Sequence, residues 1–416
     1  MEFRRNLPVS SPSSSASEPN SHPAGNNASP SSSNQDPMHS WWESVSKARS
    51  RILSLCSLLP SSAAVLSSVA ESDHPARSLL ASYDAHSALS TALSSPLAGS
   101  GSDPLCHWLY DAFQSTDPDL RLVVLSVLPL LTALYLCRVF SSSNSDPPPS
   151  LSGFEAVLLS VYASETKARA GKPVLITIPD LSQPCLYCVP QNPPGHTAAV
   201  GARSGPSVRV VSPPLEPQIA VKSTKRACII GVALDSYYKQ ISQLPSWSKR
   251  EFCQFAAEWA GQHCPCRTEF DETEVETDGV SKVMDADAEV NGHAIDRAVV
   301  GMGNLQFEEH QEKLMPAGVR IPLPWELFQP ILRIMGHCLL APLNSQDVKA
   351  AASVAVRCLY ARASHDLLPQ AVLATRSLIQ LDNRRRAAAK AAAVANASNS
   401  NTPSKSKKPE ILLVSK

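Results

Sequence analysis

The sequence has no excess of charge of either sign. Its 416 residues include 37 lysines and arginines and 37 aspartates and glutamates. Without a global electrostatic field, the protein is not expected to attract nucleic acid or anionic lipid over long distances, so any such contact must be local. Glycine is also scarce, with 16 residues against 35 prolines, and many prolines lie with serine in segments that have little to bury. We therefore expect ordered and disordered segments to alternate along the chain.

The first residues, MEFRRNLPVSSPSSS, contain no apolar core of the kind found in secretory signals. We therefore expect a protein of the reducing cytosol, whose eleven cysteines stay free thiols and form no disulfide framework. The Ser-rich, acid-poor start is also compatible with a plastid transit peptide, but it lacks the Arg-rich amphipathic face of such peptides. We favour a disordered tail over residues 1–40.

The sequence also lacks the motifs of the common enzyme classes. It contains no Gly-x-Ser-x-Gly elbow, no Walker loop, no His-Glu-x-x-His helix and no kinase-like set of lysine and aspartate. Ser364, His365 and Asp366 supply the letters of a hydrolase triad, but adjacent residues cannot occupy its three positions. Asp366 is instead expected to cap the start of the last helix. We predict that the protein is not an enzyme and needs no cofactor.

Two segments approach metal-binding patterns without completing them. Asp287, Glu289 and Asn291 fall at the first, third and fifth positions of a calcium loop. The twelfth position is Ala298, where a bidentate glutamate is needed. A zinc site could draw on Cys185, Cys188, His263, Cys264 and Cys266. Its second half has a one-residue gap in place of the usual two, so we interpret these side chains as ordinary thiols and a histidine, and expect no metal.

Apolar residues recur at helical spacing through most of the remaining sequence. In DPLCHWLYDAF they form one stripe, with Asp103 placed to cap the first turn and Pro104 where no donor is needed. Asp117 and Pro118 repeat this start signal, so an antiparallel helical pair is expected there. Further helices are predicted in WWESVSKARSRILSLCSLL, GFEAVLLSVYASE, CIIGVALDSYYKQISQL, SWSKREFCQFAAEWAGQHC, RIPLPWELFQPILRIMGHCLLAPL, SQDVKAAASVAVRCLYARAS and HDLLPQAVLATRSLIQLD. The first of these is expected to begin the ordered region and to turn Trp41 inward.

The run LRLVVLSVLPLLTALYLCRVF, residues 120–140, is apolar enough to raise the question of a membrane span. Only 16 residues lie between Arg121 and Arg138. As a helix they extend about 24 Å, against a hydrocarbon core of roughly 30 Å. Pro129 also removes one intrahelical donor, and in lipid a neighbouring helix would have to compensate for it. We predict a core helix, kinked or split at Pro129, and no transmembrane segment.

The helical pattern is interrupted in three places. PVLITIPDLSQPCLYCVP combines β-branched residues with prolines, which predicts one or two short edge strands in a minor β-hairpin. Residues 191–216 have the composition of a loop. Residues 265–318 form a disordered acidic insertion, since nine acidic residues and one lysine lie from Glu269 to Glu289. We therefore predict one all-α domain of stacked antiparallel helical hairpins over residues 41–382, with long disordered segments and a basic, polar tail over 383–416.

Taken in order, these segments resemble the hyccin family. The resemblance rests on DPLCHWLYDAFQSTDPDLRLVVLSVLPLLTALYLC, GFEAVLLSVYASE, VLITIPDLSQPCLYCVP, RIPLPWELFQPILRIM and AVLATRSLIQLD, and the Ser-rich start is similar to that of a plant member. It implies an all-helical, non-catalytic subunit of the plasma-membrane complex that contains type III alpha phosphatidylinositol 4-kinase. The implied partners are that kinase, a tetratricopeptide-repeat scaffold called No Pollen Germination in plants, and a peripheral palmitoylated anchor protein. Such a subunit would support phosphatidylinositol 4-phosphate synthesis from the cytosol and the cytosolic face of the plasma membrane.

Two sets of residues are candidates for contact with a partner or a membrane. Trp325 and Phe328, in PLPWELF, could anchor the scaffold, with core packing as the alternative. The basic residues that could face an anionic leaflet are Arg384, Arg385, Arg386, Lys405, Lys407 and Lys408. The three arginines would alternatively complement the carboxyl end of the preceding helix. The competing function is therefore an independent peripheral membrane adaptor that uses the basic C-terminal tail.

Overall fold

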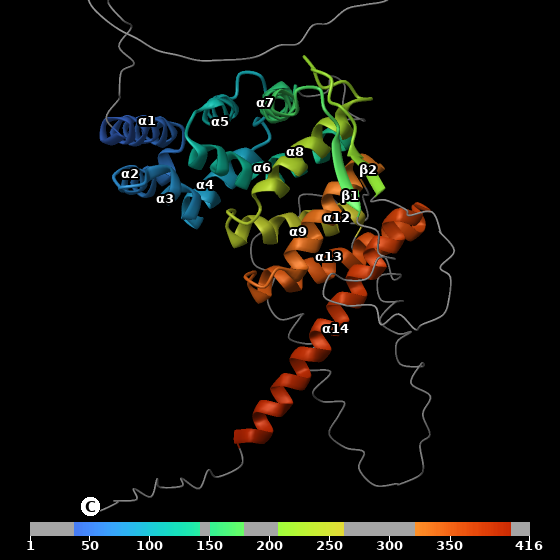
Figure 1. Cartoon of the computed structure of the whole chain (residues 1–416). Coiled ribbons are helices and arrows are strands. Elements are labelled where there is room, and N and C mark those ends of the chain that lie inside the picture. The colour runs from blue at the N-terminus through green and yellow to red at the C-terminus, as the bar shows by residue number, and fades with distance from the viewer. Residues whose placement is uncertain (1–36, 142–149, 179–206, 262–320, 401–416) are drawn as a thin grey trace, which may run out of the picture. The chain divides into compact units, whose positions relative to one another are not determined.

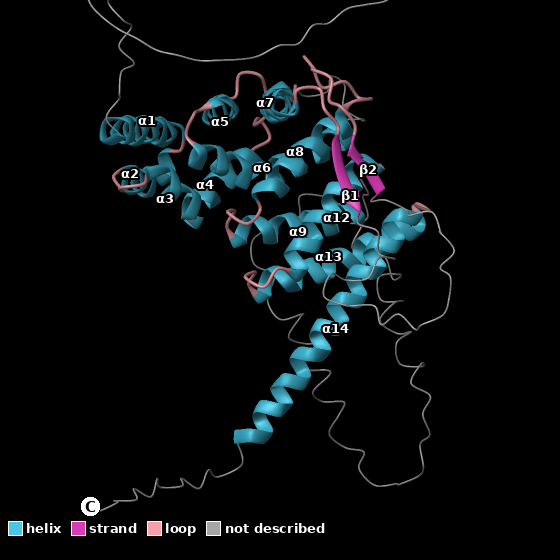
Figure 2. Cartoon of the chain, viewed as in Figure 1, coloured by secondary structure: helices cyan, strands magenta, loops and turns pink. Residues whose placement is uncertain are grey.

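Twelve α-helices and one two-stranded sheet make up the residues that the computed structural model describes, which are 37–141, 150–178, 207–261 and 321–400 (Figure 1, Figure 2). The chain divides into two units, Met1–Glu43 and Ser44–Lys416, and α2 to α14 belong to the second. The predicted all-α class is confirmed. The elements are α1 (Pro37–Leu58), a 3₁₀ turn (Pro60–Ser62), α2 (Ala63–Ala70), α3 (Pro75–Ala81), α4 (Tyr83–Ser94), α5 (Pro104–Gln114), α6 (Pro118–Ser141), α7 (Ser152–Arg169), β1 (Val174–Ile178), β2 (Ser207–Ser212), α8 (Arg226–Gln240), α9 (Ser246–Ala260), α12 (Trp325–Leu340), α13 (Gln346–His365) and α14 (Pro369–Ser400).

The predicted starts of α5 and α6 are confirmed by their caps. One carboxylate oxygen of Asp103 accepts a hydrogen bond from the amide of Leu105 at 2.9 Å, and the other accepts from the amide of Gly99 at 2.7 Å. Asp117 accepts in the same way from the amide of Asp119 at 2.9 Å. Each cap satisfies amides that a first helical turn leaves without a partner, and the two helices pack against each other.

The core of the second unit is built from the predicted apolar stripes. Phe154 on α7, Tyr237 on α8 and Phe252 on α9 are all fully buried. Helix α9 packs on α13, α8 packs on α12, and α7 packs on both α5 and α8. Gly231 allows the close approach of α8 to α12, because a Cβ atom at this position would lie 2.4 Å from the carbonyl oxygen of Glu326.

Helix α6 carries the apolar run and lies inside the bundle. Every residue from Leu122 to Leu136 is buried, and the helix contacts α3, α4, α5, α8 and α9. It is continuous through Pro129, so the predicted core helix is confirmed but a split at the proline is not. By length and composition, α6 is the one single helix among the described residues that could cross a membrane, yet 83% of its apolar window is buried within the protein. Its apolar surface is used in packing.

The sheet consists of β1 and β2 in antiparallel pairing. Strand β1 lies in the segment that was predicted to form a strand. Strand β2 lies within residues 191–216, so the prediction of a loop is wrong for this part of the segment. Leu175 faces Val210, and Thr177 faces Val208. The 28 residues between the strands, 179–206, separate the two halves of this pairing in sequence, and for that reason no short-range hairpin signal marks β2.

Two other predictions are wrong, and the end of the last helix differs from its predicted position. Trp41 is 41% exposed and is not part of the core. Asp366 does not cap the last helix; it follows α13, and its carboxylate accepts from Arg362 at 2.5 Å. Helix α14 continues to Ser400, so the first part of the predicted polar tail is helical. The acidic insertion and the calcium-like and zinc-like segments lie outside the described residues.

Candidate partner-binding surfaces

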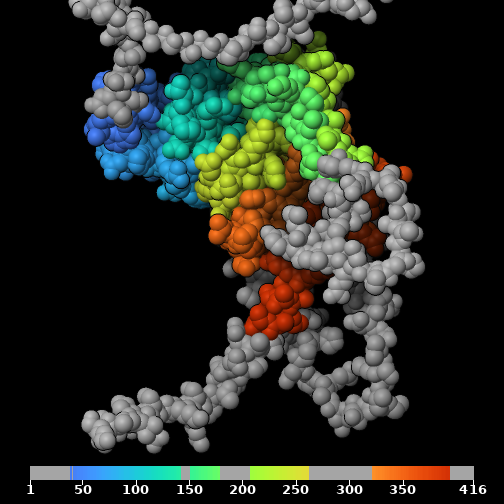
Figure 3. Space-filling view, viewed as in Figure 1, coloured from blue at the N-terminus to red at the C-terminus, as the bar shows by residue number. Residues whose placement is uncertain are grey.

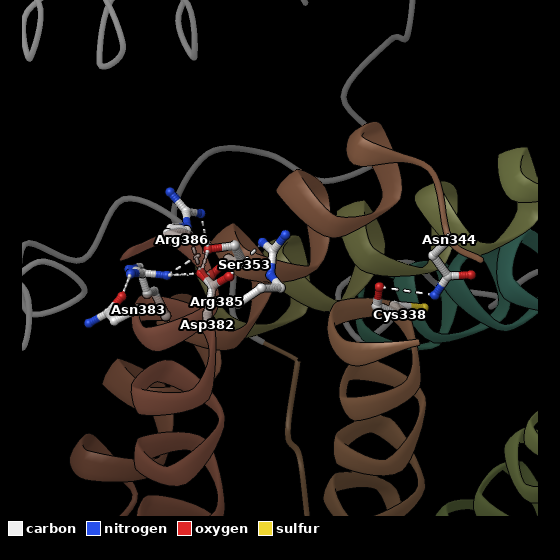
Figure 4. A network of polar contacts seen from close by, with 8 residues as sticks. Cys338, Asn344, Ser353, Asp382, Asn383, Arg385 and Arg386 are labelled. Carbon is white, nitrogen blue, oxygen red and sulfur yellow. Dashed lines mark hydrogen bonds and ion pairs between the residues drawn. The ribbon is translucent and has the colours of Figure 1, made fainter. Parts of the chain in front are cut away.

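Three arginines converge on one buried carboxylate where α13 meets α14 (Figure 4). The carboxylate of Asp382 accepts hydrogen bonds from Arg385 at 2.8 Å and from Arg386 at 2.9 Å. Arg357, on α13, reaches the same carboxylate at 3.3 Å. Ser353 donates to Asp382 at 2.6 Å, and its hydroxyl oxygen accepts from Arg357 and Arg386, each at 2.6 Å. We call these five residues the arginine cluster, and it fastens α14 to α13.

The surroundings of Asp382 favour its ionised form. Burial alone would raise the pKa of this carboxyl group, but hydrogen bonds from Ser353 and Arg385 and the charges of Arg386 and Arg357 outweigh burial and lower the pKa. The Asp382 side chain is only 1% exposed. Loss of its partners would therefore leave an uncompensated charge inside the protein, which typically costs about 3–5 kcal/mol.

The predicted basic residues have different environments. Arg384 is exposed, whereas Arg385 and Arg386 are bound in the arginine cluster with side chains 30% and 52% exposed. Because α14 continues to Ser400, the three arginines do not lie at the carboxyl end of a helix, and that alternative is wrong. The remaining basic candidates lie outside the described residues: Lys405, Lys407 and Lys408.

The two candidate anchor residues of α12 also differ. Phe328 is fully buried, so the alternative of core packing holds for it and its ring is not accessible to a partner. Trp325, the first residue of α12, is 37% exposed. Only Trp325 therefore stays a candidate for contact with a partner.

The two-stranded ribbon of β1 and β2 exposes apolar side chains on both faces, and Figure 3 shows it in green at the surface. Leu175, Val208 and Val210 share one face and are 54%, 58% and 63% exposed, while Ile176 on the other face is 51% exposed. A two-stranded hairpin has marginal stability by itself in water, and an exposed apolar patch commonly marks an interaction site. The ribbon was not anticipated as a contact surface from the sequence.

A polar cluster ties the base of the ribbon to α7. Arg169 donates to Glu165 at 2.6 Å and to the hydroxyl of Ser212, at the end of β2, at 2.7 Å. Lys239 of α8 pairs with the same glutamate. Burial would raise the pKa of Glu165, but hydrogen bonds from Lys239 and Arg169 outweigh it and lower the pKa. Arg169 thus holds the end of β2, while Glu165 pairs with both Arg169 and Lys239.

A cavity of about 230 Å³ lies between the end of β2 and α12. Its lining includes Val211 and Ser212 from the ribbon, Ile229 from α8, and Glu326 from α12. Glu326 directly follows the exposed Trp325. The cavity therefore connects the ribbon to the first turn of α12, and we call the ribbon, the cavity and Trp325 together the ribbon surface.

No three His, Cys, Asp or Glu side chains lie close enough to hold a metal ion within the part of the chain that the structure describes. Seven cysteines in this part are free thiols. Burial is the principal cause that raises the pKa of Cys106, of Cys228 and of Cys253. Buried thiols with raised pKa values are poor nucleophiles, because the thiolate is the reactive form.

A model of the hyccin family matches residues 70–412. This is far more than half of the sequence. The chain belongs to the hyccin family. The match begins at the last residue of α2 and extends through α14, so the ribbon surface and the arginine cluster both lie within the hyccin region.

In this hyccin-family chain, sequence analysis found two of the clustered arginines but missed the residues that hold them. The spacing of Asp382 to Arg385 and Arg386 is i, i+3 and i, i+4, which places them side by side on a helix and was the available signal. Ser353 and Arg357 come from another helix. Nothing in the sequence around Ser353 and Arg357 indicates that they contact α14, which is the next helix along the chain.

Proposed function

We propose that this hyccin-family chain is a non-catalytic subunit that binds a tetratricopeptide-repeat scaffold of the No Pollen Germination kind. In this role it stabilises a type III alpha phosphatidylinositol 4-kinase complex at the cytosolic face of the plasma membrane and so supports phosphatidylinositol 4-phosphate synthesis. The observation that carries the proposal is the family match over residues 70–412. Recruitment of the complex is assigned to a peripheral anchor protein.

The burial of α6 supports an indirect attachment to the membrane. Helix α6 is long and apolar enough to cross a membrane, yet its residues from Leu122 to Leu136 are buried against neighbouring helices. A role as a packed helical subunit requires such a core. The membrane is then contacted by the assembled complex and by charged residues at its surface, and not by α6.

The ribbon surface is the contact that we propose for the scaffold. A stable protein interface buries on the order of 1,600 Å² in total, with aromatic and apolar residues near its centre. The face formed by Leu175, Val208 and Val210 supplies exposed apolar area, and Trp325 supplies an aromatic ring of the kind enriched at interface hot spots.

The proposed function is tested by recovery of partners with tagged full-length protein from cells. We expect the repeat scaffold and the lipid kinase to be recovered with the wild-type chain. The double variant Leu175→Thr and Val210→Thr keeps residue types that favour strands but removes apolar surface from a cross-strand pair. It should lower recovery of the scaffold about tenfold, which corresponds to about 1.4 kcal/mol.

A matched control replaces two leucines that are exposed in loops elsewhere. Leu97 and Leu343 are 86% and 98% exposed, and the Leu97→Thr and Leu343→Thr variant should recover partners like the wild type. If the wild-type protein recovers neither a repeat scaffold nor a lipid kinase, the proposed function is wrong. If the two double variants recover equal amounts of scaffold, only the assignment to the ribbon surface is wrong.

The second candidate function is an independent peripheral membrane adaptor that uses the basic C-terminal region. The observation that favours it is the exposure of Arg384 together with the partial exposure of Arg385 and Arg386. Flotation of the purified chain with anionic vesicles in the absence of partners tests this function. Deletion of residues 384–416 is a poor variant for that assay, because it removes Arg385 and Arg386 of the arginine cluster together with the lysines of the tail and does not show which of them binds the vesicles.

A further inference from the structure

Arg385 and Arg386 carry more hydrogen-bond donors than the described residues offer them as acceptors. These acceptors are the carboxylate of Asp382 and the hydroxyl oxygen of Ser353. Each guanidinium group is donor-only. The Nε of Arg385 is buried and has no acceptor among the described residues. A buried donor without an acceptor is unfavourable, so an additional acceptor at this place would be stabilising.

Positive charge is concentrated at the same place. Between Asp382 and Lys390 the chain carries four basic residues and one acidic residue, although the net charge of the whole sequence is zero. Residues 387–393, which follow the arginines, are all exposed. An anion that approaches this part of α14 therefore meets a local excess of positive charge. Among the described residues, Asp382 is the one carboxylate that pairs with Arg385 and Arg386.

Asp382 and Ser353 orient the arginines without covering them. Arg386 uses its Nε and Nη2 groups for these two residues, and half of its side chain is exposed. Its Nη1 group has no partner among the described residues. A guanidinium group that is already held in one orientation loses little conformational freedom when it binds a ligand.

We propose that Arg385 and Arg386, held by Asp382 and Ser353, bind a phosphate group of an anionic phospholipid headgroup, with Arg384 adding a third positive charge. The planar guanidinium group matches the geometry of phosphate oxygens and pairs with them in bidentate fashion. The proposal rests on the proposed function, because a subunit of a membrane-associated lipid kinase complex is held close to such headgroups. Free phosphate has the same chemistry and is the alternative source.

The test uses the purified full-length chain and sedimentation with vesicles. The probes are phosphatidylcholine vesicles, the same vesicles with phosphatidylinositol 4-phosphate, and vesicles in which phosphatidylserine supplies an equal total charge. We expect the wild-type protein to bind the phosphoinositide vesicles about tenfold more strongly than the neutral ones. The Arg385→Gln and Arg386→Gln variant should bind all three at the level of the neutral vesicles.

A charge-matched control separates the site from general attraction. Lys172 and Lys222 are exposed and lie outside both the arginine cluster and the ribbon surface, so the Lys172→Gln and Lys222→Gln variant loses the same charge and should bind like the wild type. Asp382→Asn adds one positive charge. General attraction predicts stronger binding by this variant, whereas a site oriented by Asp382 predicts weaker binding. Thermal unfolding establishes that each variant is folded, and Ser353→Ala replaces Asp382→Asn if the latter is not.

Inorganic phosphate distinguishes the two sources of the ligand. If phosphate raises the unfolding temperature of the wild type but not of the arginine double variant, and no vesicles are bound, the site takes soluble phosphate and the lipid assignment is wrong. Equal vesicle binding by the wild type and the arginine double variant overturns the proposal, as does the absence of any response to either probe. The assay contains no partner protein, so its failure leaves the recovery of scaffold and kinase as a separate result.

Discussion

Trp325 and Phe328 lie three residues apart on α12 and differ in burial, which makes them a matched pair for substitution. Phe328→Ala should destabilise the protein by about 3–5 kcal/mol, because it opens a cavity in the core. Trp325→Ala should change stability by less than about 1 kcal/mol, since its ring is partly exposed, but should reduce recovery of the scaffold. Urea unfolding and partner recovery measure the two effects. Unchanged stability of Phe328→Ala would contradict its placement in the core.

The carboxylate of Asp382 should make stability depend on pH in a defined direction. Its pKa is lowered in the folded protein, so its contribution is complete above the unfolded-state value of about 4 and is lost as pH falls through the folded-state value. At pH 7, Asp382→Asn should cost about 3 kcal/mol, at the low end for a buried pair because Arg386 stays half solvated. The difference in free energy of unfolding between wild type and variant should shrink as pH falls below about 4.

Asp235 provides a control of opposite sign. Burial raises its pKa although Arg333 lies 2.9 Å away. The folded state therefore favours the protonated form, and the stability that this group contributes is lost as pH rises through the raised pKa. Relative to wild type, Asp235→Asn should gain stability as pH rises above about 4. Urea unfolding between pH 3 and pH 7 gives both slopes, and slopes of the same sign for the two variants would refute the assignment.

At the scale of single elements, the features that depend on nearby residues, such as helix starts and apolar stripes, were predicted from the sequence. The starts of α5 and α6 follow from Asp103 and Asp117, whose side chains bond to amides two residues away. The stripes follow from the helical period. Strand β2 was missed because its partner is distant in sequence and its side chains are exposed, so the burial pattern that marks strands is weak. The end of α14 was placed too early because a basic, polar composition was given more weight than the high helix propensity of its alanines.

The candidate site was less predictable than the fold for a related reason. A row of three arginines is visible in the sequence, but its orientation depends on Ser353 and Arg357, which another helix brings to it. The exposed state of Trp325 and the buried state of Phe328 also depend on tertiary packing, because both residues fit the same amphipathic pattern. The burial of these two residues and the orientation of the arginines are determined by contacts between segments that are distant in sequence. Local periodicity does not reveal such contacts.

The packing of α8 on α12 can be tested at one glycine. Gly231→Ala places a Cβ atom 2.4 Å from the carbonyl oxygen of Glu326, so the helices must move apart at a cost of about 1–3 kcal/mol. Gly336→Ala, on α12, is the control, because its Cβ would meet only Leu378 at an ordinary 3.7 Å. This control should gain up to about 1 kcal/mol from helix propensity. Thermal unfolding should therefore shift in opposite directions, and equal shifts would contradict the close approach at Gly231.

At the scale of the whole molecule, the two candidate surfaces belong to different parts of the hyccin region. The ribbon surface involves β1, β2, α8 and α12, and the arginine cluster involves α13 and α14. A partner that binds only the folded chain stabilises it by mass action, by about 4 kcal/mol at a thousandfold excess over the dissociation constant. Scaffold binding at the ribbon would therefore stabilise the fold.

The basic tail beyond α14 gives the last prediction. If Lys405, Lys407 and Lys408 contacted an anionic membrane, each would contribute about 1 kcal/mol, and the Lys→Gln variant at all three positions would bind more than about a hundredfold more weakly. If the arginine cluster is the membrane contact, this triple variant should bind phosphoinositide vesicles within about threefold of the wild type, because less than about 1 kcal/mol is lost. The arginine double variant should still lose binding, although it removes one positive charge fewer. A larger loss in the lysine variant than in the arginine variant would assign the membrane contact to the tail and favour the independent adaptor.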